Sequence, residues 1–330
     1  MALSLHTPFS SPSQHLLLKP TQKTPLYAYA VSKLPLGGRT KPQFSRSIFT
    51  TRALLSVTKE AVLEDFRQKK ALKIISGLQN YNKDNVASVI TAADKGGATH
   101  VDIACDPELV KLALSLTSLP ICVSSVDPLA FLAAVEAGAT MVEIGNYDSF
   151  YEMGRLFSPD EILKLTKETK ELLPSLTLSV TVPHTLSLPE QSNTYFSFFG
   201  LIIVHQQAKL AELLEQEGAD IIQTEGGKCS SPSKPGVIGL IEKATPTLAA
   251  AYAISRAVKI PVLCSSGLSA VTASMAITAG AAGVGVGSAV NKLDNVVAMI
   301  AEVRSIADAL ASSKMRANVN VDHEKTLGRL

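Results

Sequence analysis

The stretch AGAAGVGVGSAV runs from Ala279 to Val290 and has a glycine at almost every second position before Ser288. Glycine weakens a strand and costs conformational entropy, so this run indicates that something approaches the main chain closely. The opening phrase of the stretch recurs along the chain. Earlier versions, each with Gly-Ala just before an apolar run, are GGATHVDI (96–103), AGATMVEI (137–144) and EGADIIQT (217–224). The repeat predicts a unit in which a helix ends at Gly-Ala and a strand follows.

Short apolar or β-branched runs alternate with helical patterns from about residue 70 onward. The runs that we expect to form strands cover residues 72–78, 100–104, 120–125, 141–145, 176–182, 220–226, 261–266 and 283–288. Eight such units in roughly 240 residues predict an α/β fold, a (β/α)8 TIM barrel of the phosphate-binding type. A doubly wound open sheet is the alternative. The repeat favours the barrel, because it precedes every second strand and closure makes alternate strands equivalent.

The first 59 residues differ in composition from the rest of the chain. They contain eight Lys or Arg and no Asp or Glu, and they are rich in Ser and Thr. This composition is typical of an organelle transit peptide, and the abundance of Ser and Thr favours the plastid. We therefore predict a disordered plastid transit peptide over residues 1–52 and a mature protein in the chloroplast stroma. The alternative is a disordered basic arm that binds an acidic partner.

The remainder of the chain has 23 basic and 29 acidic residues, a net charge of −6. A protein of this charge is not expected to bind nucleic acid. No apolar run reaches the roughly 18 residues of a membrane-spanning helix, so we expect no association with a membrane. The four cysteines are far apart and form no CxxC pair, so the sequence predicts no metal site.

We place the barrel at residues 60–312 and a disordered tail at 313–330. Within the barrel, residues 192–206 form an atypical insert, which is apolar, rich in Phe and without a partner in the repeat. We interpret this insert as translated intron sequence or a splice variant. The alternative is an additional hydrophobic helix that contacts another subunit, which would make the protein a homo-oligomer.

Glycine and serine end the last two predicted strands. Active sites of (β/α)8 barrels lie at the carboxyl ends of the strands, and many of these barrels bind a phosphate between the loops after strands seven and eight. Backbone N–H groups in such turns donate to the phosphate oxygens. The predicted phosphate-binding residues are Ser265, Ser266, Gly267, Gly285, Gly287 and Ser288. The alternative is that the glycines only allow strand eight to pack tightly against its helix.

Four ionisable residues, Lys73, Asp102, Glu143 and Glu225, occupy positions on four different predicted strands. A charge inside a barrel is costly unless it is paired, so we expect these side chains to form one buried polar cluster. A desolvated lysine beside carboxylates becomes a base or a Schiff-base nucleophile near neutral pH, which makes all four residues catalytic candidates. The alternative is a structural salt-bridge network, which the early position of Lys73 in its strand favours.

Two loops carry further catalytic candidates. His184 follows the fifth strand in TVPH, and a histidine at a barrel mouth is a natural acid or base. In EGGK, Glu225 is placed to abstract a proton and Lys228 to hold an anion. The alternatives are a surface histidine and a glycine turn with two solvated charges. We also expect Asn146 and Tyr147 to hydrogen-bond a sugar-like ligand.

Several of these motifs together resemble the hypothetical chloroplast open reading frame 23 family. The phrases that carry the resemblance include ISGLQNYN, ATHVDIACDPELV, LPICVSSVDP, VEIGNYDSFY and IIQTEGGK. The resemblance covers about residues 60–312 except the insert, and it implies a TIM-barrel-like fold in a plastid. It implies no particular reaction. The glycine-rich phosphate motif is also similar to that of thiazole synthases and sugar-phosphate epimerases, which is an analogy of fold.

Three functional hypotheses remain open from the sequence. The first is an enzyme that binds a small phosphorylated metabolite and acts as an epimerase, an aldolase-type lyase or a synthase. The second is a sensor that binds such a metabolite without converting it. The third is a flavin-binding barrel, because the phosphate of FMN can use the same two loops. The sequence predicts no other cofactor.

Overall fold

The computed structural model describes residues 59–186, 196–227 and 232–327. The chain divides after Phe44 into two units, and the first unit lies outside the described residues, as does the predicted transit peptide. Eight parallel strands in the second unit form a closed barrel in chain order. These strands are β1 (Ala71–Ile75), β2 (His100–Ala104), β3 (Ile121–Ser125), β4 (Met141–Ile144), β5 (Thr177–Val182), β6 (Ile221–Thr224), β7 (Val262–Ser265) and β8 (Gly283–Val286). The predicted (β/α)8 barrel and all eight of its strands are confirmed.

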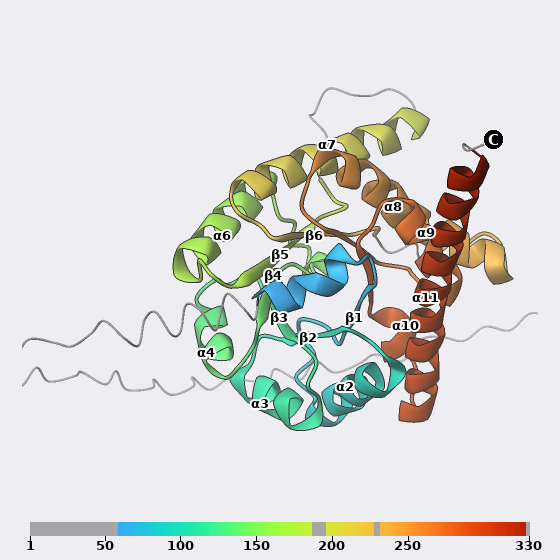
Figure 1. The fold of residues 1–330 in the computed structure, drawn as a ribbon. Coiled ribbons are helices and arrows are strands. Elements are labelled where there is room, and N and C mark those ends of the chain that lie inside the picture. Colours follow the sequence, from blue (N-terminus) through green and yellow to red (C-terminus); the bar gives the residue numbers. More distant parts are fainter. Residues whose placement is uncertain (1–58, 187–195, 228–231, 328–330) are drawn as a thin grey trace, which may run out of the picture. The chain divides into compact units, whose positions relative to one another are not determined.

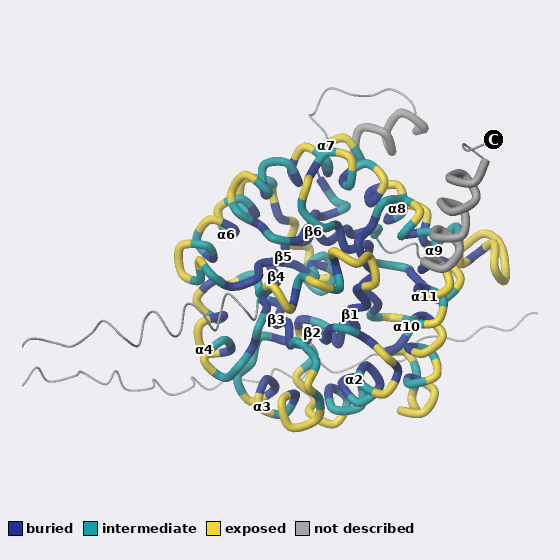
Figure 2. The backbone as a smooth tube through the Cα atoms, viewed as in Figure 1, coloured by how far each residue is buried: buried dark blue, intermediate teal, exposed yellow. Residues whose placement is uncertain are grey.

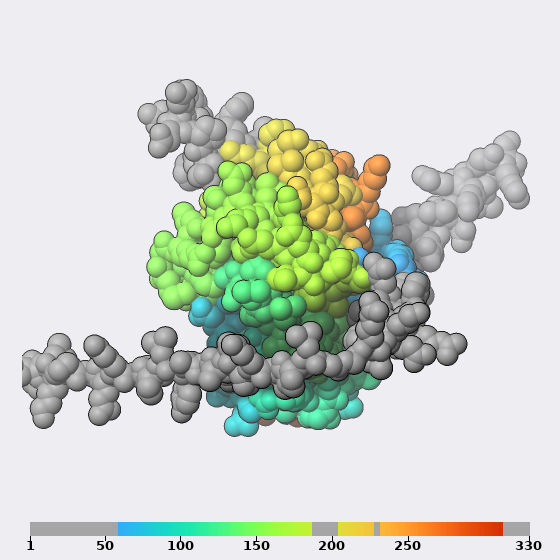
Figure 3. Space-filling view, turned by 90° about the vertical axis from the view of Figure 1, so that its left-hand side faces the viewer, coloured from blue at the N-terminus to red at the C-terminus, as the bar shows by residue number. Residues whose placement is uncertain are grey.

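Helices follow the strands and form the outer layer around the barrel (Figure 1). They are α2 (Lys83–Gly96), α3 (Pro107–Leu116), α4 (Ala130–Glu136), α5 (Asp148–Glu152), α6 (Pro159–Leu172), α7 (Phe196–Gln216), α8 (Gly236–Ala257), α9 (Ala270–Thr278), α10 (Ser288–Asn291) and α11 (Val296–Leu327). Figure 3 shows the flank of the barrel in which α4 and α6 lie, coloured in shades of green.

Local sequence signals explain where several helices begin and end. Asn82 and Asp106 cap α2 and α3, and the side chain of each accepts a hydrogen bond from a backbone N–H of the first turn. Such caps satisfy N–H groups that have no partner inside the helix. After α2, Gly97 adopts a φ of 90°, the left-handed conformation in which glycine ends helices. Gly97 is the glycine of the Gly-Ala pair that precedes β2. The repeat seen in the sequence is therefore the end of a helix followed by a strand.

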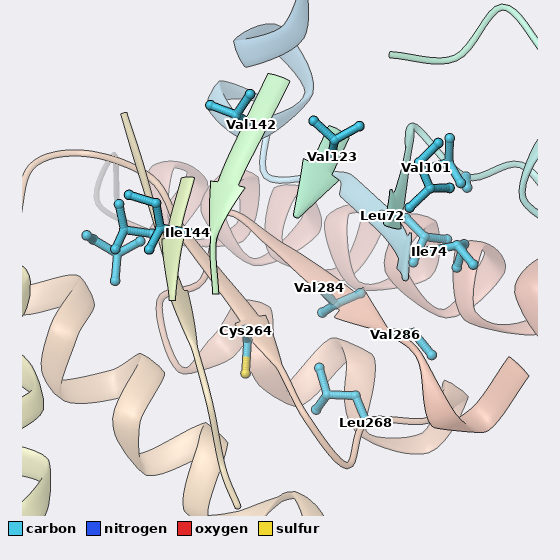
Figure 4. Close-up of a cluster of buried hydrophobic side chains, with 14 of the residues drawn as sticks. Leu72, Ile74, Val101, Val123, Val142, Ile144, Cys264, Leu268, Val284 and Val286 are labelled. Atoms are coloured by element: carbon cyan, nitrogen blue, oxygen red, sulfur yellow. The ribbon is translucent and has the colours of Figure 1, made fainter. Parts of the chain in front are cut away.

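Each strand buries both of its faces, as parallel strands in a barrel do (Figure 2). Figure 4 shows apolar side chains such as Leu72, Ile74 and Val142, which belong to the main core cluster together with the buried faces of the helices. The residues that alternate with them, such as Lys73 and Glu143, point into the barrel. The chemistry of the protein therefore depends on this second set of strand residues.

A helix over residues 59–67 covers the end of the barrel at which the strands begin, and it is the blue helix at the centre of Figure 1. Its Val62 and Phe66 are buried in a second core cluster, whose other members come mostly from the first inward position of the strands: Ala71, Cys122, Met141, Ile221, Leu263 and Ala282. The backbone oxygen of Val62 also lies 3.0 Å from Nε2 of His100. This helix therefore closes the barrel interior at the amino-terminal ends of the strands.

Gly283, the first strand residue of the glycine-rich run, is required by packing. A Cβ atom at this position would lie 2.4 Å from the backbone oxygen of Ala71 and 2.5 Å from its Cβ. Strands β8 and β1 therefore approach each other in the bottom layer only because residue 283 has no side chain. The close contact at Gly283 is therefore with the neighbouring strand β1 and not with a helix, which differs from the packing alternative, whereas Gly285 and Gly287 lie nearer the mouth.

We expect Gly283→Ala to lower the free energy of unfolding by about 1–3 kcal/mol, because the added methyl overpacks a layer bounded by backbone. The matched control is Gly287→Ala, where the nearest atom to a new Cβ lies 3.3 Å away. The control is expected to change stability by less than about 1 kcal/mol. Urea unfolding followed by circular dichroism measures both. Equal effects of the two substitutions would contradict this explanation of the glycine.

Two predicted segments differ from the observed elements. Helix α7 begins at Phe196, so residues 196–206 of the predicted insert are helical and continue into a regular barrel helix. Helix α11 continues to Leu327, although the sequence analysis expected a disordered tail from residue 313. No glycine or proline interrupts the chain between residues 296 and 327, so the sequence contains no strong helix stop before Gly328.

Within the described ranges, one helix, α8, is long and apolar enough to cross a membrane by length and composition alone. In the barrel its Ala244, Thr247, Ala251 and Ile254 are buried. Proline at position 246 lies inside it. A helix that packs one face against a barrel can be as long and as apolar as a membrane-spanning helix, so the composition of α8 is consistent with its place in the barrel.

Candidate functional site

A cavity of about 340 Å³ lies at the mouth of the barrel. All six residues that the sequence analysis assigned to a phosphate line it, namely Ser265, Ser266, Gly267, Gly285, Gly287 and Ser288. Strands β7 and β8 are neighbours, with Ser265 paired to Gly285. The two glycine-serine strand ends are therefore side by side and share one hollow.

The turn after β7 has an unusual backbone. Ser266 and Gly267 have φ angles of 82° and 70°, so two successive residues are left-handed and one of them is not glycine. Such turns direct consecutive backbone N–H groups into one concavity, which suits an anion. Hydroxyls fix the strand end below the turn, since the N–H of Ser265 donates to Thr224 Oγ1 over 3.1 Å and Thr247 donates to the Ser265 oxygen. The strained turn is therefore held in place by side chains beneath it.

A second cavity of about 540 Å³ adjoins the first. The residues common to both are Ile75, Asn146, Asp148, Ser265, Ser266, Gly287, Ser288 and Lys292. The second cavity is also lined by Thr181, Gln223 and Glu225. The two hollows therefore form one site, with the glycine-serine turns in one part and Glu225 in the other.

Two lysines that the sequence analysis did not select line the first cavity. Lys243 is half-buried on α8, and Lys292 is exposed directly after α10. Lys292 follows the glycine-rich run by only a few residues, so its position was readable from the sequence. Lys243 comes to the site only through the topology. The predicted anion-holding Lys228 lies outside the described residues.

Glu225 is held by three hydrogen bonds to one of its oxygens. Its Oε2 accepts from Tyr151 Oη at 2.7 Å and from the backbone N–H of His184 at 3.1 Å, and it lies 2.9 Å from Nδ1 of His184. The rings of Tyr151 and His184 meet edge to face, 5.1 Å apart. Burial and the charge of Glu225 raise the pKa of the Tyr151 hydroxyl, which keeps it a hydrogen-bond donor. Tyr151 was not predicted as a site residue, although it ends the quoted phrase VEIGNYDSFY, because nothing local in that phrase places its hydroxyl beside Glu225.

His184 itself is not among the residues that line the two cavities, whereas Glu225 is. Space beside the histidine ring is limited, because a Cβ at Gly227 would lie 2.6 Å from its Cδ2. The geometry therefore presents Glu225 to a ligand and uses His184 to orient Glu225. The sequence analysis expected His184 itself to act as an acid or base, whereas this geometry favours a positioning role.

Lys73 forms a fully buried ion pair with Glu143. Glu143 also accepts hydrogen bonds from Thr181 Oγ1 at 3.1 Å and from Gln223 Nε2 at 2.6 Å. Burial on its own would lower the pKa of Lys73, but the charges of Glu143 and Asp102 outweigh it and raise that pKa above its ordinary value. Lys73 lines neither cavity and keeps its proton at neutral pH. This geometry favours the structural salt-bridge alternative over a Schiff-base lysine.

Asp102 extends this network toward the mouth. Its carboxylate accepts from Ser124 Oγ at 2.7 Å and from Asn146 Nδ2 at 2.8 Å. Asn146 has a φ of 61° and lines both cavities, so it links the buried network to the site. Burial raises the pKa of Asp102 to about 6, and the nearby charge of Glu143 adds to this effect. Glu225 lies apart from the network, so the predicted single cluster of four is in fact two clusters.

The raised pKa of Asp102 predicts a pH-dependent stability. The folded protein holds this proton more tightly than the unfolded chain, so the free energy of unfolding falls as pH rises from about 4 through about 6, by roughly 2–3 kcal/mol. Asp102→Asn is always neutral and is expected to remove this part of the slope. Urea unfolding of both proteins between pH 4 and pH 8 measures the difference. If the difference in the free energy of unfolding between the two proteins stays constant from pH 4 to pH 8, the raised pKa of Asp102 is contradicted.

Tyr147 does not reach the site. Its ring is fully buried, and its hydroxyl donates to the backbone oxygen of Thr181 over 3.2 Å. The expected contact of Asn146 with a ligand remains a prediction, since Asn146 lines both cavities. Among the described residues, no group of three or more His, Cys, Asp or Glu side chains is placed to hold a metal ion.

Comparison with known proteins supplies a family. Residues 57–197 and 199–316 match the family model described as "Protein of unknown function (DUF561)". The chain belongs to this family. The matched residues include most of 192–206, and the interpretation of these residues as an insert stays a prediction. The family match covers the whole barrel, including both strand ends that line the first cavity.

Curated relatives confirm the resemblance noted in the sequence. "Uncharacterized protein ycf23" of Cyanophora paradoxa is 40% identical over 235 residues, which are 71% of this chain and 90% of the relative. The protein of the same name from Porphyra purpurea is 35% identical over 260 residues, which are 78% of this chain and 92% of the relative. Since ycf denotes a hypothetical chloroplast reading frame, membership of this family indicates a plastid protein.

Solved structures resemble the chain in fold. A designed cube-shaped protein cage is 14% identical, with a TM-score of 0.50 and coverage of 78% of this chain and 81% of that chain. The (S)-3-O-geranylgeranylglyceryl phosphate synthase from Thermoplasma acidophilum, solved with sn-glycerol-1-phosphate, is also 14% identical, with a TM-score of 0.48 and coverage of 76% and 97%. At this identity, neither likeness assigns a ligand or a reaction to this chain.

Proposed function

We propose that this protein binds a small phosphorylated metabolite at the mouth of its barrel and that Glu225 transfers a proton from and to this metabolite. One observation carries the proposal: two glycine-serine strand ends line a hollow that adjoins the cavity of a buried, hydrogen-bonded carboxylate. One part of the site offers hydrogen-bond donors to an anion, and the other part offers a proton acceptor. Such a site suits a phosphorylated substrate better than a neutral one.

The proposed phosphate end rests on three kinds of donor. The left-handed turn at Ser266 and Gly267 supplies backbone N–H groups, Ser288 supplies a hydroxyl, and Lys243 and Lys292 supply positive charge. Hydrogen bonds from such groups to a charged acceptor are stronger than neutral ones. Lys228 remains a further candidate for holding the anion.

The proposed chemistry begins at a carbon next to a carbonyl group. The Glu225 carboxylate takes a proton from this carbon, and the electron pair of the broken C–H bond forms an enolate. If Glu225 returns the proton to the neighbouring carbon of an enediolate, the product is an isomer, and if water delivers a proton from the opposite face, the product is an epimer. If the enolate carbon instead attacks the carbonyl carbon of an acceptor, a C–C bond forms, the π electrons of the acceptor's C=O bond move to its oxygen, and this oxygen takes the proton held by Glu225, as in a synthase or a reversed lyase. Tyr151 and His184 hold one oxygen of Glu225 in place for this transfer. Lys73, Glu143 and Asp102 support the site from below.

The proposed location is the chloroplast stroma. The family indicates a plastid, and the acid-free leader rich in Ser and Thr supports import by a transit peptide that ends near Arg52. Amino-terminal sequencing of the protein from its native compartment measures the cleavage site. A mature chain that still contains residues 1–52 would contradict the transit peptide.

Two measurements on the purified protein test the function. Calorimetry with inorganic phosphate and a panel of phosphorylated hydroxycarbonyl compounds measures binding, and NMR in D₂O measures exchange of the hydrogen next to the carbonyl. We expect binding, and exchange that falls by about 10²–10⁴-fold in Glu225→Gln. Binding with no exchange for any panel member would support the sensor hypothesis instead. A yellow protein that absorbs in the flavin band would support a flavin barrel, and absence of phosphate binding would overturn the proposal.

A further inference from the structure

Gln223 lines the second cavity and has a buried carbonyl oxygen without a hydrogen-bond partner among the described residues. Its side chain is 2% exposed, lines this cavity, and comes from an inward position of β6. The amide nitrogen is fully used, because Nε2 lies 2.6 Å from Glu143 Oε1, 3.1 Å from Thr181 Oγ1 and 3.3 Å from Asn146 Oδ1. These acceptors fix the orientation of the amide, so it is the oxygen, Oε1, that remains unsatisfied among the described residues.

Asn291 repeats this arrangement from the end of α10. Its Nδ2 donates to the backbone oxygens of Ile75 and Ser76, at 2.9 Å and 3.2 Å. Both partners are carbonyl oxygens, so this amide also has only one orientation that makes hydrogen bonds. Its buried Oδ1 has no partner within the described part of the chain, and Asn291 lines the same cavity as Gln223.

The hydroxyl of Ser149 is a third such group. It is buried, lines the second cavity and has no hydrogen-bond partner among the described residues. Buried polar groups in native proteins are almost always paired, and each exception has a cost that a bound partner removes. Three exceptions around one cavity, two of which can only accept, point to a ligand that brings several donors.

We infer that the metabolite bound by this protein is a phosphorylated polyhydroxy compound, of the sugar phosphate or polyol phosphate class. This inference rests on the proposed phosphate site. The phosphate occupies the part lined by the glycine-serine turns, and hydroxyl groups further along the ligand donate to Gln223 Oε1 and Asn291 Oδ1. A hydroxyl also accepts, so it can bind the Ser149 hydroxyl in either direction. A phosphate ester with an alkyl chain would leave all three groups unpaired.

Matched pairs of probes test the ligand class. Glycerol 3-phosphate is compared with n-propyl phosphate, and ribitol 5-phosphate with n-pentyl phosphate, by calorimetry on the full chain. None of these compounds has a carbonyl group, so binding is measured without turnover. We expect the polyol phosphate of each pair to bind at least about 10-fold more tightly, because one unmade buried hydrogen bond costs roughly this factor.

Ser149→Ala provides the variant, because it removes a hydroxyl that donates no hydrogen bond to any described residue, and we therefore expect it to preserve the fold. We expect it to weaken the polyol phosphates by about 3–10-fold and to leave the alkyl phosphates unchanged. Ser115→Ala, at an exposed position of α3, is the control and is expected to change neither. Equal binding within each pair overturns the ligand class while the phosphate site stands. Failure of all four esters and of inorganic phosphate to bind overturns the proposed function as well.

Discussion

Replacing Glu143 by alanine is expected to lower the free energy of unfolding by about 3–5 kcal/mol, because Lys73 is left as an unpaired buried charge. The loss extends beyond the ion pair, since Thr181 and Gln223 both donate to Glu143 and lose their acceptor. Urea unfolding of the variant and the wild-type protein at the same pH measures the change.

A double variant separates charge from packing in this layer. In Lys73→Met combined with Glu143→Gln, neither position of the ion pair carries a charge, and the glutamine still offers an acceptor to Thr181 and Gln223. We expect this protein to be closer in stability to the wild type than Glu143→Ala is, since replacing a buried pair by groups of similar volume is often nearly neutral. A Glu143→Ala protein that loses less than about 1 kcal/mol would show that the pair contributes little.

The fold was predictable because its signals are local and repeated. The helix stop at Gly97 and the alternation in MVEI both depend on neighbours in the chain, and they recur often enough to count the units. The two-residue period of a strand also predicted correctly that Lys73, Asp102 and Glu143 point inward. The helix over residues 59–67 was missed, because nothing in its own sequence says that it closes a barrel.

The site was less predictable than the fold, because the alternation of inward and outward residues in a strand does not show how far along the barrel axis a side chain lies. Lys73 pairs with Glu143 and lines neither cavity, whereas Glu225 follows directly after β6 and lines the second cavity. Lys73 and Glu225 therefore belong to different clusters, although both were expected in one. Tyr151 and Lys243 come from helices whose approach to the mouth depends on loop paths that local patterns do not encode.

Introducing a negative charge at the phosphate end is expected to weaken binding of phosphorylated ligands by roughly 100-fold. Ser288 is exposed, begins α10 and lines both cavities. In Ser288→Asp, a carboxylate would stand within a few ångströms of the bound phosphate, and repulsion at a partly solvated site is worth about 3 kcal/mol, or roughly 100-fold in affinity. Calorimetry with inorganic phosphate and glycerol 3-phosphate measures the loss.

Two controls separate repulsion from damage to the fold. Ser288→Asn has the same size and no charge, and it is expected to stay within about 10-fold of the wild-type affinity. Ser115→Asp places the same charge on α3, outside both cavities, and is expected to leave binding unchanged. The stability of Ser288→Asp is expected to be preserved, since an acidic residue is favourable in the first turn of a helix. If Ser288→Asp binds phosphate as tightly as Ser288→Asn does, the anion lies elsewhere, and the glycine-serine turns serve only the packing of β7 and β8.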